Sequence, residues 1–208
     1  GLYAAPGEVI TVTLPPGIVD SGTYVLVGAH SDSLWGKSQL HRHPQIARWW
    51  YVDSATMEVG NAFGGPIYIG IQAGSTLGDF DVTISNAVKA PRYIHGETDI
   101  FQWQQQFRHD PAPWAEIGSG QFILTVPSHE IRDLDNPQDL MDWWDQALAM
   151  EHEIYGYTPW PRVERAVFDA QISAGWMHSG YPFMAHDLSV AGVVNVSYMS
   201  ENGDWGMV

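Results

Sequence analysis

Nine histidines and no cysteine limit the metal and nucleophile chemistry open to this chain. His41 and His43 are the most suggestive pair, because alternate residues of an extended strand project to one face and two imidazoles could share a metal ion. A metal site needs a third and usually a fourth ligand, and no aspartate or glutamate adjoins the pair at a recognisable spacing. We therefore interpret these two histidines as part of a solvated loop.

Two other histidines begin like a zinc-protease signature. In His-Glu-x-x-His, two imidazoles one helical turn apart bind zinc, and the glutamate activates a metal-bound water. His129-Glu130 and His152-Glu153 both lack the second histidine. We interpret them as surface residues near helix ends, and we predict no catalytic and no metal-binding residue within this chain.

Phosphate-binding and nucleophile motifs are also missing. Gly64-Gly65-Pro66 is not followed by the Gly-Lys-Ser/Thr of a phosphate-binding loop, and Ser179 lacks the Gly-x-Ser-x-Gly context of a nucleophile elbow. The lack of cysteine excludes disulfides, thiolate zinc sites and a cysteine nucleophile. Residue patterns alone therefore give no complete catalytic constellation.

Ten tryptophans and nine tyrosines are an unusual aromatic content. The pairs Trp49-Trp50 and Trp143-Trp144 can each place one ring inward, so packing in the core should account for most of these side chains. A minority could form a flat platform for sugar rings, since the C–H faces of a sugar stack well on indole. A carbohydrate-binding module is therefore a second functional hypothesis.

The elements that must position these residues fall into two parts. From residue 1 to about residue 92, short apolar runs separated by glycine and proline predict an antiparallel β-sandwich. The predicted strands of this part are 10–14, 24–27, 48–52, 66–71 and 80–84. No helical spacing occurs there.

The second part mixes helices and strands. Asn136 as N-cap, Pro137 in the first turn and Gly156 as terminator predict a helix over 137–155. Its apolar residues share one broad face, which we expect to pack on a sheet: Leu140, Trp143, Trp144, Ala147, Leu148 and Ile154. Strands at 121–126 and 166–172, a short helix over 98–109 capped by Thr98, and a turn at 111–114 complete an α+β fold.

Charge narrows the range of partners. Twenty-four acidic residues against nine basic ones give a net charge of −15, so phosphates of nucleic acids and anionic membranes would repel the chain. We therefore expect no binding to nucleic acids or to anionic membranes. We also expect no membrane insertion, because no stretch approaches the ~18 apolar residues of a membrane span. The acidic residues are dispersed, as on a solvated surface.

The first residue is Gly1 rather than methionine, which indicates a processed form, an excised piece or a fragment.

Seven short phrases follow one another in a familiar order. They are Gly1-Leu2-Tyr3-Ala4-Ala5-Pro6-Gly7-Glu8, Gly64-Gly65-Pro66-Ile67-Tyr68-Ile69, Val88-Lys89-Ala90-Pro91, Pro113-Trp114-Ala115-Glu116, Ile123-Leu124-Thr125-Val126-Pro127-Ser128, Leu140-Met141-Asp142-Trp143-Trp144 and His178-Ser179-Gly180-Tyr181-Pro182. Together they resemble the enhancin-like, mucin-targeting zinc metallopeptidases of metallopeptidase family sixty. The resemblance spans nearly the whole chain.

This resemblance implies a β-rich sandwich-like region at 1–92 and the front part of a zincin-like domain at 93–208. Family members bind zinc through a gluzincin His-Glu-x-x-His motif and a more distant glutamate, just after a Trp-Gly phrase. Here Trp205-Gly206 is followed only by Met207 and Val208. We therefore expect zinc in the complete family enzyme and none in this chain, with the C-terminal catalytic segment as a partner. We also expect the chain alone to cleave no peptide, and residues from about Met184 onward to be loose or held by a partner segment.

Substrate recognition follows from the same resemblance. In zincins an edge strand pairs with extended substrate by β-augmentation, and Gly64, Gly65 and Tyr68 lie on the candidate strand 64–69, although an ordinary sheet strand is the alternative. The substrate implied is a mucin-like glycoprotein or glycan, and the location implied is secreted or at the cell surface.

Three further residues are candidates for lining the cleft and stacking on a sugar: His178, Tyr181 and Trp205. The alternative for Tyr181 and Trp205 is packing behind the active-site helix. Two functions thus stay open, namely the substrate-positioning part of a zinc metallopeptidase and a non-catalytic carbohydrate-binding or adhesion module.

Overall fold

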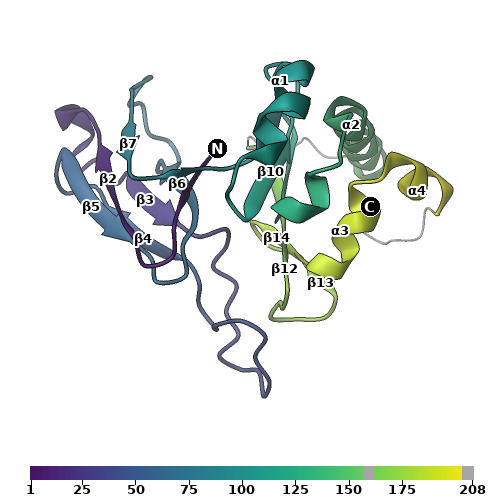
Figure 1. The fold of residues 1–208 in the computed structure, drawn as a ribbon, viewed down its shortest axis with the longest axis horizontal. Coiled ribbons are helices and arrows are strands. Elements are labelled where there is room, and N and C mark those ends of the chain that lie inside the picture. Colours follow the sequence, from purple (N-terminus) through teal and green to yellow (C-terminus); the bar gives the residue numbers. More distant parts are fainter. Residues whose placement is uncertain (157–161, 203–208) are drawn as a thin grey trace.

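The computed structural model describes residues 1–156 and 162–202, and these form two parts that lie side by side (Figure 1). A pair of small sheets makes the N-terminal part. A larger sheet, with helices packed against it, makes the C-terminal part. The predicted α+β class is confirmed, because a β-rich sandwich precedes a region of mixed sheet and helix.

The N-terminal part is a sandwich of a five-stranded sheet, in the order β4-β3-β6-β1-β8, and a three-stranded sheet, in the order β5-β2-β7. The strands are β1 Leu2–Ala4, β2 Val9–Thr13, β3 Tyr24–Val27, β4 Arg48–Tyr51, β5 Thr56–Gly60, β6 Gly65–Gly70, β7 Thr83–Ser85 and β8 Val88–Lys89. Ile10 and Val12 of β2 and Val25 and Val27 of β3 are fully buried between the sheets. Alternation of apolar and polar residues therefore predicts the inward face correctly.

The C-terminal part is built on a six-stranded sheet in the order β13-β14-β12-β11-β10-β9. Its strands are β9 Arg92–Ile94, β10 Trp114–Gly118, β11 Phe122–Pro127, β12 Glu164–Asp169, β13 Met177–His178 and β14 Phe183–His186, and its helices are α1 Ile100–Gln105, α2 Pro137–Tyr155, α3 Val190–Val193 and α4 Val196–Glu201. Strands β11, β12 and β14 run parallel, whereas β13 runs antiparallel to β14 at the edge. The chain passes from the first sheet to this one between Lys89 and Arg92.

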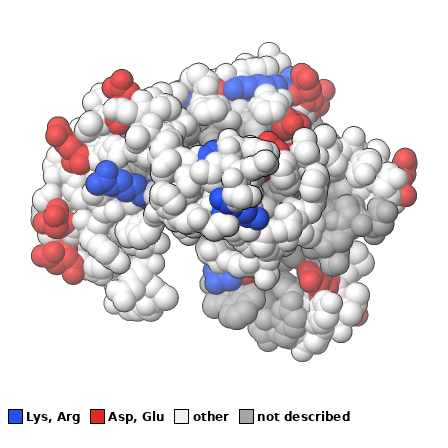
Figure 2. Space-filling model, turned by 90° about the horizontal axis from the view of Figure 1, so that it is seen from below, with Lys and Arg blue, Asp and Glu red and all other residues white. Residues whose placement is uncertain are grey.

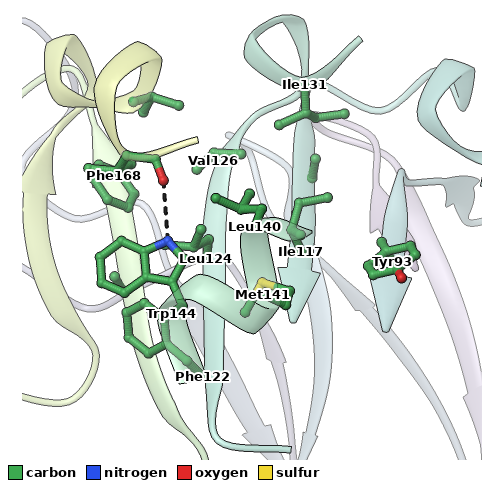
Figure 3. Close-up of a cluster of buried hydrophobic side chains, with 14 of the residues drawn as sticks. Tyr93, Ile117, Phe122, Leu124, Val126, Ile131, Leu140, Met141, Trp144 and Phe168 are labelled. Atoms are coloured by element: carbon green, nitrogen blue, oxygen red, sulfur yellow. Dashed lines mark hydrogen bonds between the residues drawn. The ribbon is translucent and has the colours of Figure 1, made fainter. Parts of the chain in front are cut away.

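Helix α2 supplies much of the core of this second part. Its ends lie where the sequence predicts them: the Asn136 side chain accepts the Asp139 N–H, and Gly156 adopts φ 67°. Figure 3 shows Leu140, Met141 and Trp144 packed on the sheet, with the indole N–H of Trp144 donating to the carbonyl of Val193 at 3.2 Å. The helix therefore joins the sheet to α3.

The prediction that the apolar face of α2 is buried as far as Ile154 is wrong. Ile154 has the right helical spacing but is 79% exposed. The buried residues of α2 end at Ala147, so the last two turns extend past the apolar surface formed by the described sheet. Helical periodicity shows which face is apolar, but it does not show how far the neighbouring sheet extends.

Other boundaries also differ from prediction. Hydrogen-bonded pairing covers only the end of the predicted strand 80–84, as β7, and the predicted strand 166–172 begins and ends earlier, as β12. Asp99 rather than Thr98 caps α1, because its carboxylate accepts the Gln102 N–H. Strand β5 lies in a stretch where no strand is predicted.

The expected looseness from Met184 onward is wrong for residues 184–202. Strand β14 lies between β12 and β13, and its Met184 and Ala185 are buried. Val190, Val193 and Met199 of the following helices join the core beneath α2. Residues 184–202 are ordered because β14 pairs with strands on both sides and because the helices after it bury apolar side chains.

Acidic side chains are spread over the surface. Seen from below, they lie in separate places around the molecule and do not form one continuous patch (Figure 2). Among the residues that the structure describes, no helix combines the length and the apolar character needed to cross a membrane.

Candidate functional site

Strand β13 forms an open edge of the large sheet. It pairs with β14 on one side, and no described strand pairs with its other side. The N–H of His186 donates to the carbonyl of Trp176 at 3.0 Å, which makes these two residues a hydrogen-bonded pair. Because hydrogen-bonded and non-bonded pairs alternate in an antiparallel ladder, the N–H and C=O of Met177 point to the open side. An extended peptide could therefore pair with this strand.

The predicted substrate edge at residues 64–69 is wrong as an open edge. Strand β6 pairs with β1 through Gly65 and Pro66 and with β3 through Ile67 to Gly70, so it lies between two strands and is not at the end of its sheet. Gly64 and Gly65 are buried. A Cβ on Gly65 would lie 2.5 Å from the Cα of Gly28, so glycine is needed for the close approach of two strands.

His178 ends β13 and is held from two directions. Its Nε2 lies 3.2 Å from the hydroxyl of Ser173 and 3.5 Å from the Asp32 carboxylate. Asp32 also accepts the Ser173 backbone N–H at 2.7 Å. Asp32 belongs to the N-terminal part, so a residue from the sandwich fixes the segment that leads into β13.

These three residues do not form a catalytic triad. In a Ser-His-Asp triad the serine and the carboxylate lie on opposite ring nitrogens. Here both lie on Nε2 of His178, and Nδ1 is 3.1 Å from the carbonyl oxygen of Ser179. The cluster therefore positions the strand and provides no activated nucleophile.

A long loop of residues 28–47 brings Asp32 to this place. It joins β3 to β4 and extends below the two sheets (Figure 1). Loops of this length without secondary structure are uncommon in compact domains unless they bind something or are held in place. We call residues 28–47 the bridging loop.

Arg42 anchors the bridging loop to the C-terminal part. Its side chain is 9% exposed, and Nε lies 2.6 Å from the carboxylate of Asp169 at the end of β12. The same guanidinium donates to the carbonyls of Gln171, His43 and Asp32. Burial lowers the pKa of Arg42, and the two neighbouring aspartates partly offset this effect.

Buried His30 completes the anchor. Its Nε2 is 2.8 Å from Asp169, and its Nδ1 accepts the Asp32 N–H at 3.1 Å. Burial alone raises the pKa of Asp32, but hydrogen bonds from Ser173, with the charges of His178 and His30, lower it below the ordinary value of 3.8. The carboxylate therefore stays charged and keeps its partners.

Tyr68 lies in a different junction between the two parts. Its hydroxyl donates to Glu116 at 2.7 Å, and Arg165 bonds to both Tyr68 and Glu116. Burial and then the Glu116 charge raise the pKa of Tyr68 well above 10.0. Arg165 lies four residues before Asp169 on β12, about 13 Å along the strand, so this junction is remote from the bridging-loop anchor.

Tyr181 lies in the turn that follows β13 and is exposed. Its hydroxyl donates to the carbonyl of Val163 at 3.2 Å, and the Arg162 guanidinium lies 4.2 Å from its ring centroid. The structure thus brings His178 and Tyr181 together on the β13–β14 hairpin and places Tyr68 elsewhere. Trp205 lies outside the described residues.

The described residues do not fit a zinc site. Within 1–156 and 162–202, no three histidine, aspartate or glutamate side chains gather where they could hold a metal ion. The loop interpretation of His41 and His43 is confirmed, because neither lies in a strand and His43 stacks on Phe63 with ring centroids 4.5 Å apart.

Sequence reasoning missed the bridging-loop anchor. The one available signal is the long interval between two predicted strands, residues 28–47, which a compact sandwich does not require. Nothing in the local pattern links Arg42 to Asp169, more than a hundred residues away.

The chain combines a β-sandwich with a mixed sheet that carries an antiparallel edge strand. The chain belongs to the family described as Peptidase M60, enhancin and enhancin-like: the model of that family matches residues 86–208. The model of the N-terminal domain of M60-like peptidases matches residues 1–85. The predicted resemblance is confirmed.

The curated relatives are longer proteins. The TRPM8 channel-associated factor homolog of Xenopus laevis is 40% identical over 209 residues, which cover 100% of this chain and 23% of that protein. TRPM8 channel-associated factor 1 of Homo sapiens is 36% identical over 210 residues, with the same coverage. The chain therefore spans about a quarter of the length of these relatives.

Solved structures share the fold at low sequence identity. The ZmpB metallopeptidase from Clostridium perfringens aligns with a TM-score of 0.73 and 15% identity, over 93% of this chain and 44% of that one. IMPa from Pseudomonas aeruginosa, solved in complex with an O-glycopeptide, aligns with a TM-score of 0.61 and 18% identity, over 90% and 26%. The ZmpC catalytic domain, solved in complex with the sialyl T antigen, aligns with a TM-score of 0.67 and 13% identity, over 93% of this chain and 44% of that one.

Proposed function

We propose that this chain is the substrate-positioning part of a zinc metallopeptidase that acts on mucin-like O-glycoproteins. The observation that carries the proposal is the open antiparallel edge of β13 within an M60 fold. Backbone pairing along such an edge holds a substrate in extended form and needs no particular side chains from it.

Glycosylated substrates are supported by the structural neighbours. One of them was solved with an O-glycopeptide and another with the sialyl T antigen. His178 and Tyr181 lie on the β13–β14 hairpin, so they are placed to contact a peptide on β13 or its sugar. Direct substrate contact by Gly64, Gly65, Tyr68 and Trp205 stays a prediction. Gly64 and Gly65 are buried, and the Tyr68 hydroxyl is bonded to Glu116 and Arg165, which disfavours such contact for these three residues.

The chain's own contribution is binding and orientation. In the complete family enzyme, zinc would supply an activated water for hydrolysis. The described residues do not fit zinc, so we propose that the metal is held by a segment this chain does not contain, and that the chain alone is inactive. Because its proposed substrates are mucin-like, we propose that the protein is secreted or lies at the cell surface.

A substitution at the open edge tests the proposal. Met177→Pro removes the N–H that points away from β14, so it should abolish binding of an extended O-glycopeptide while the β14 pairing persists. Met177→Leu is the matched control, because it keeps that N–H and a similar volume. Circular dichroism checks that both variants fold, and isothermal calorimetry measures binding. A folded Met177→Pro variant that binds as well as the control would contradict pairing at β13.

A second candidate function is a non-catalytic carbohydrate-binding or adhesion module. It is favoured by the relatives that are 36–40% identical, because these are named as channel-associated factors and not as peptidases. A mucin pull-down separates the two readings. Capture that survives Tyr181→Ala and Trp205→Ala but depends on the N-terminal sandwich supports the module, whereas loss of capture in Met177→Pro supports the peptidase reading.

A further inference from the structure

Trp176 is a large apolar side chain in an exposed position beside β13. It directly precedes Met177 and is 53% exposed, whereas Trp103 and Trp144 are buried in the core. Trp35 and Trp49 are exposed as well, so exposure alone does not mark a site. Trp176 differs in its place directly beside the open strand β13.

The surroundings of Trp176 fix its ring in one orientation. The indole stacks on the imidazole of His186, with centroids 4.9 Å apart and planes at 13°. Its Nε1–H donates to the Ser189 hydroxyl at 2.7 Å, and its carbonyl accepts the His186 N–H at 3.0 Å. One face and the polar edge are therefore occupied, while the exposed area leaves the other face open.

We propose that the open face of Trp176 is a stacking platform for the sugar of an O-glycopeptide bound along β13. This inference rests on the proposed function. The C–H face of a pyranose packs on a flat indole, and a ring already fixed by its neighbours loses little conformational entropy on binding. Side chains alternate between the two faces of a sheet, so a substrate residue opposite Trp176, next to the one that pairs with Met177, points to the same face as the indole. A sugar on that residue would lie within cross-strand reach of Trp176.

Polar groups beside the indole suit the hydroxyls of a neutral sugar. The Asp187 carboxylate, whose side chain is 33% exposed, lies 2.9 Å from the ring of His186 and can accept hydrogen bonds from sugar hydroxyls. The acidic character of the chain favours a neutral sugar over one that carries a carboxylate. A lysine of the substrate could also approach an indole face, so the test must separate a sugar from a cation.

The experiment compares two peptides with identical sequences. Each contains one lysine, and one of them carries O-linked N-acetylgalactosamine on a threonine. Calorimetry measures their binding to the wild-type chain and to three variants: Trp176→Ala, Trp176→Phe and Trp49→Ala. Trp49 is the matched control, because it is 48% exposed and lies on β4 in the sandwich.

The expected result is specific to the sugar. Trp176→Ala should weaken binding of the glycopeptide about tenfold and leave binding of the bare peptide unchanged, as for a tryptophan at the centre of a contact. Trp176→Phe should keep much of the affinity, because it retains a flat ring, and Trp49→Ala should change nothing.

Other results would overturn the inference. Unchanged glycopeptide binding by a folded Trp176→Ala variant rejects the platform and leaves pairing at β13 intact. Equal losses for both peptides assign Trp176 to the peptide or its lysine and reject the sugar. A third probe, free methyl N-acetylgalactosaminide, tests the sugar without a peptide. If the wild-type chain binds this sugar and the glycopeptide through Trp176 but does not bind the bare peptide, the platform is supported and pairing at β13 is contradicted. No binding of any probe rejects both.

Discussion

Replacing Arg42 with methionine should loosen the contact between the bridging loop and the C-terminal part. The guanidinium is buried, lies 2.6 Å from Asp169 and donates to carbonyls on both sides of the junction. Removing one partner of a buried ion pair typically costs about 3–5 kcal/mol, because the other charge stays buried. Asp169 keeps His30 as a partner, so we expect the lower end, about 3 kcal/mol.

The assay is urea unfolding, supported by a melting temperature that should fall by roughly 6–12 °C for a chain of this size. Arg48→Met is the control. Arg48 is exposed on β4 and lies 5.1 Å from the centroid of Trp50, so its loss should cost less than about 1 kcal/mol. Hydrogen exchange adds a local measurement, since residues 170–178 should exchange faster in Arg42→Met. Equal costs for the two variants, with unchanged exchange at 170–178, would refute the anchoring role.

Further predictions concern pH, packing and metal. Stability should fall as the pH drops below about 4, because a carboxylate with a lowered folded pKa contributes stability only while it is charged; Asp32→Asn should flatten that part of the curve of unfolding free energy against pH. Gly65→Ala should lower the melting temperature markedly, because the new Cβ would meet Gly28, whereas Gly36→Ala has open space and should not. Trp144→Ala should cost about 3–5 kcal/mol in denaturant, and a loss below about 1 kcal/mol would contradict its place in the core. After dialysis, elemental analysis of the chain should find less than one zinc per molecule, and a stoichiometric zinc would contradict the predicted lack of a metal site.

Much of the fold could be predicted from the sequence because the residues that determine it are close together along the chain. The cap, the first-turn proline and the terminating glycine of α2 are adjacent to the helix they delimit, so they predict 137–155 without tertiary information. Alternation in Ile10 and Val12 shows the inner face of β2 for the same reason. Family membership was also visible in the order of short phrases along the chain.

Predictions from local sequence patterns failed where residues distant in the sequence determine the burial or the pairing of an element. The periodicity of α2 continues to Ile154, but within residues 1–156 and 162–202 the sheet provides no apolar surface there. The phrase at residues 64–69 was conspicuous in the sequence, yet strand order makes β6 an interior strand. Which strand has a free side is a property of the whole sheet and has no local signature.

The sequence by itself determined the α+β class, the M60 family, the ends of α2 and the lack of a His-Glu-x-x-His motif. Tertiary structure alone decided that β13 is an open edge of the large sheet, that Trp176 is held beside it, and that Arg42 and Asp32 join the bridging loop to that region. The physical reason is distance along the chain. His30 and Asp169 are 139 residues apart, and only the packing of two sheets brings such groups to within 2.8 Å.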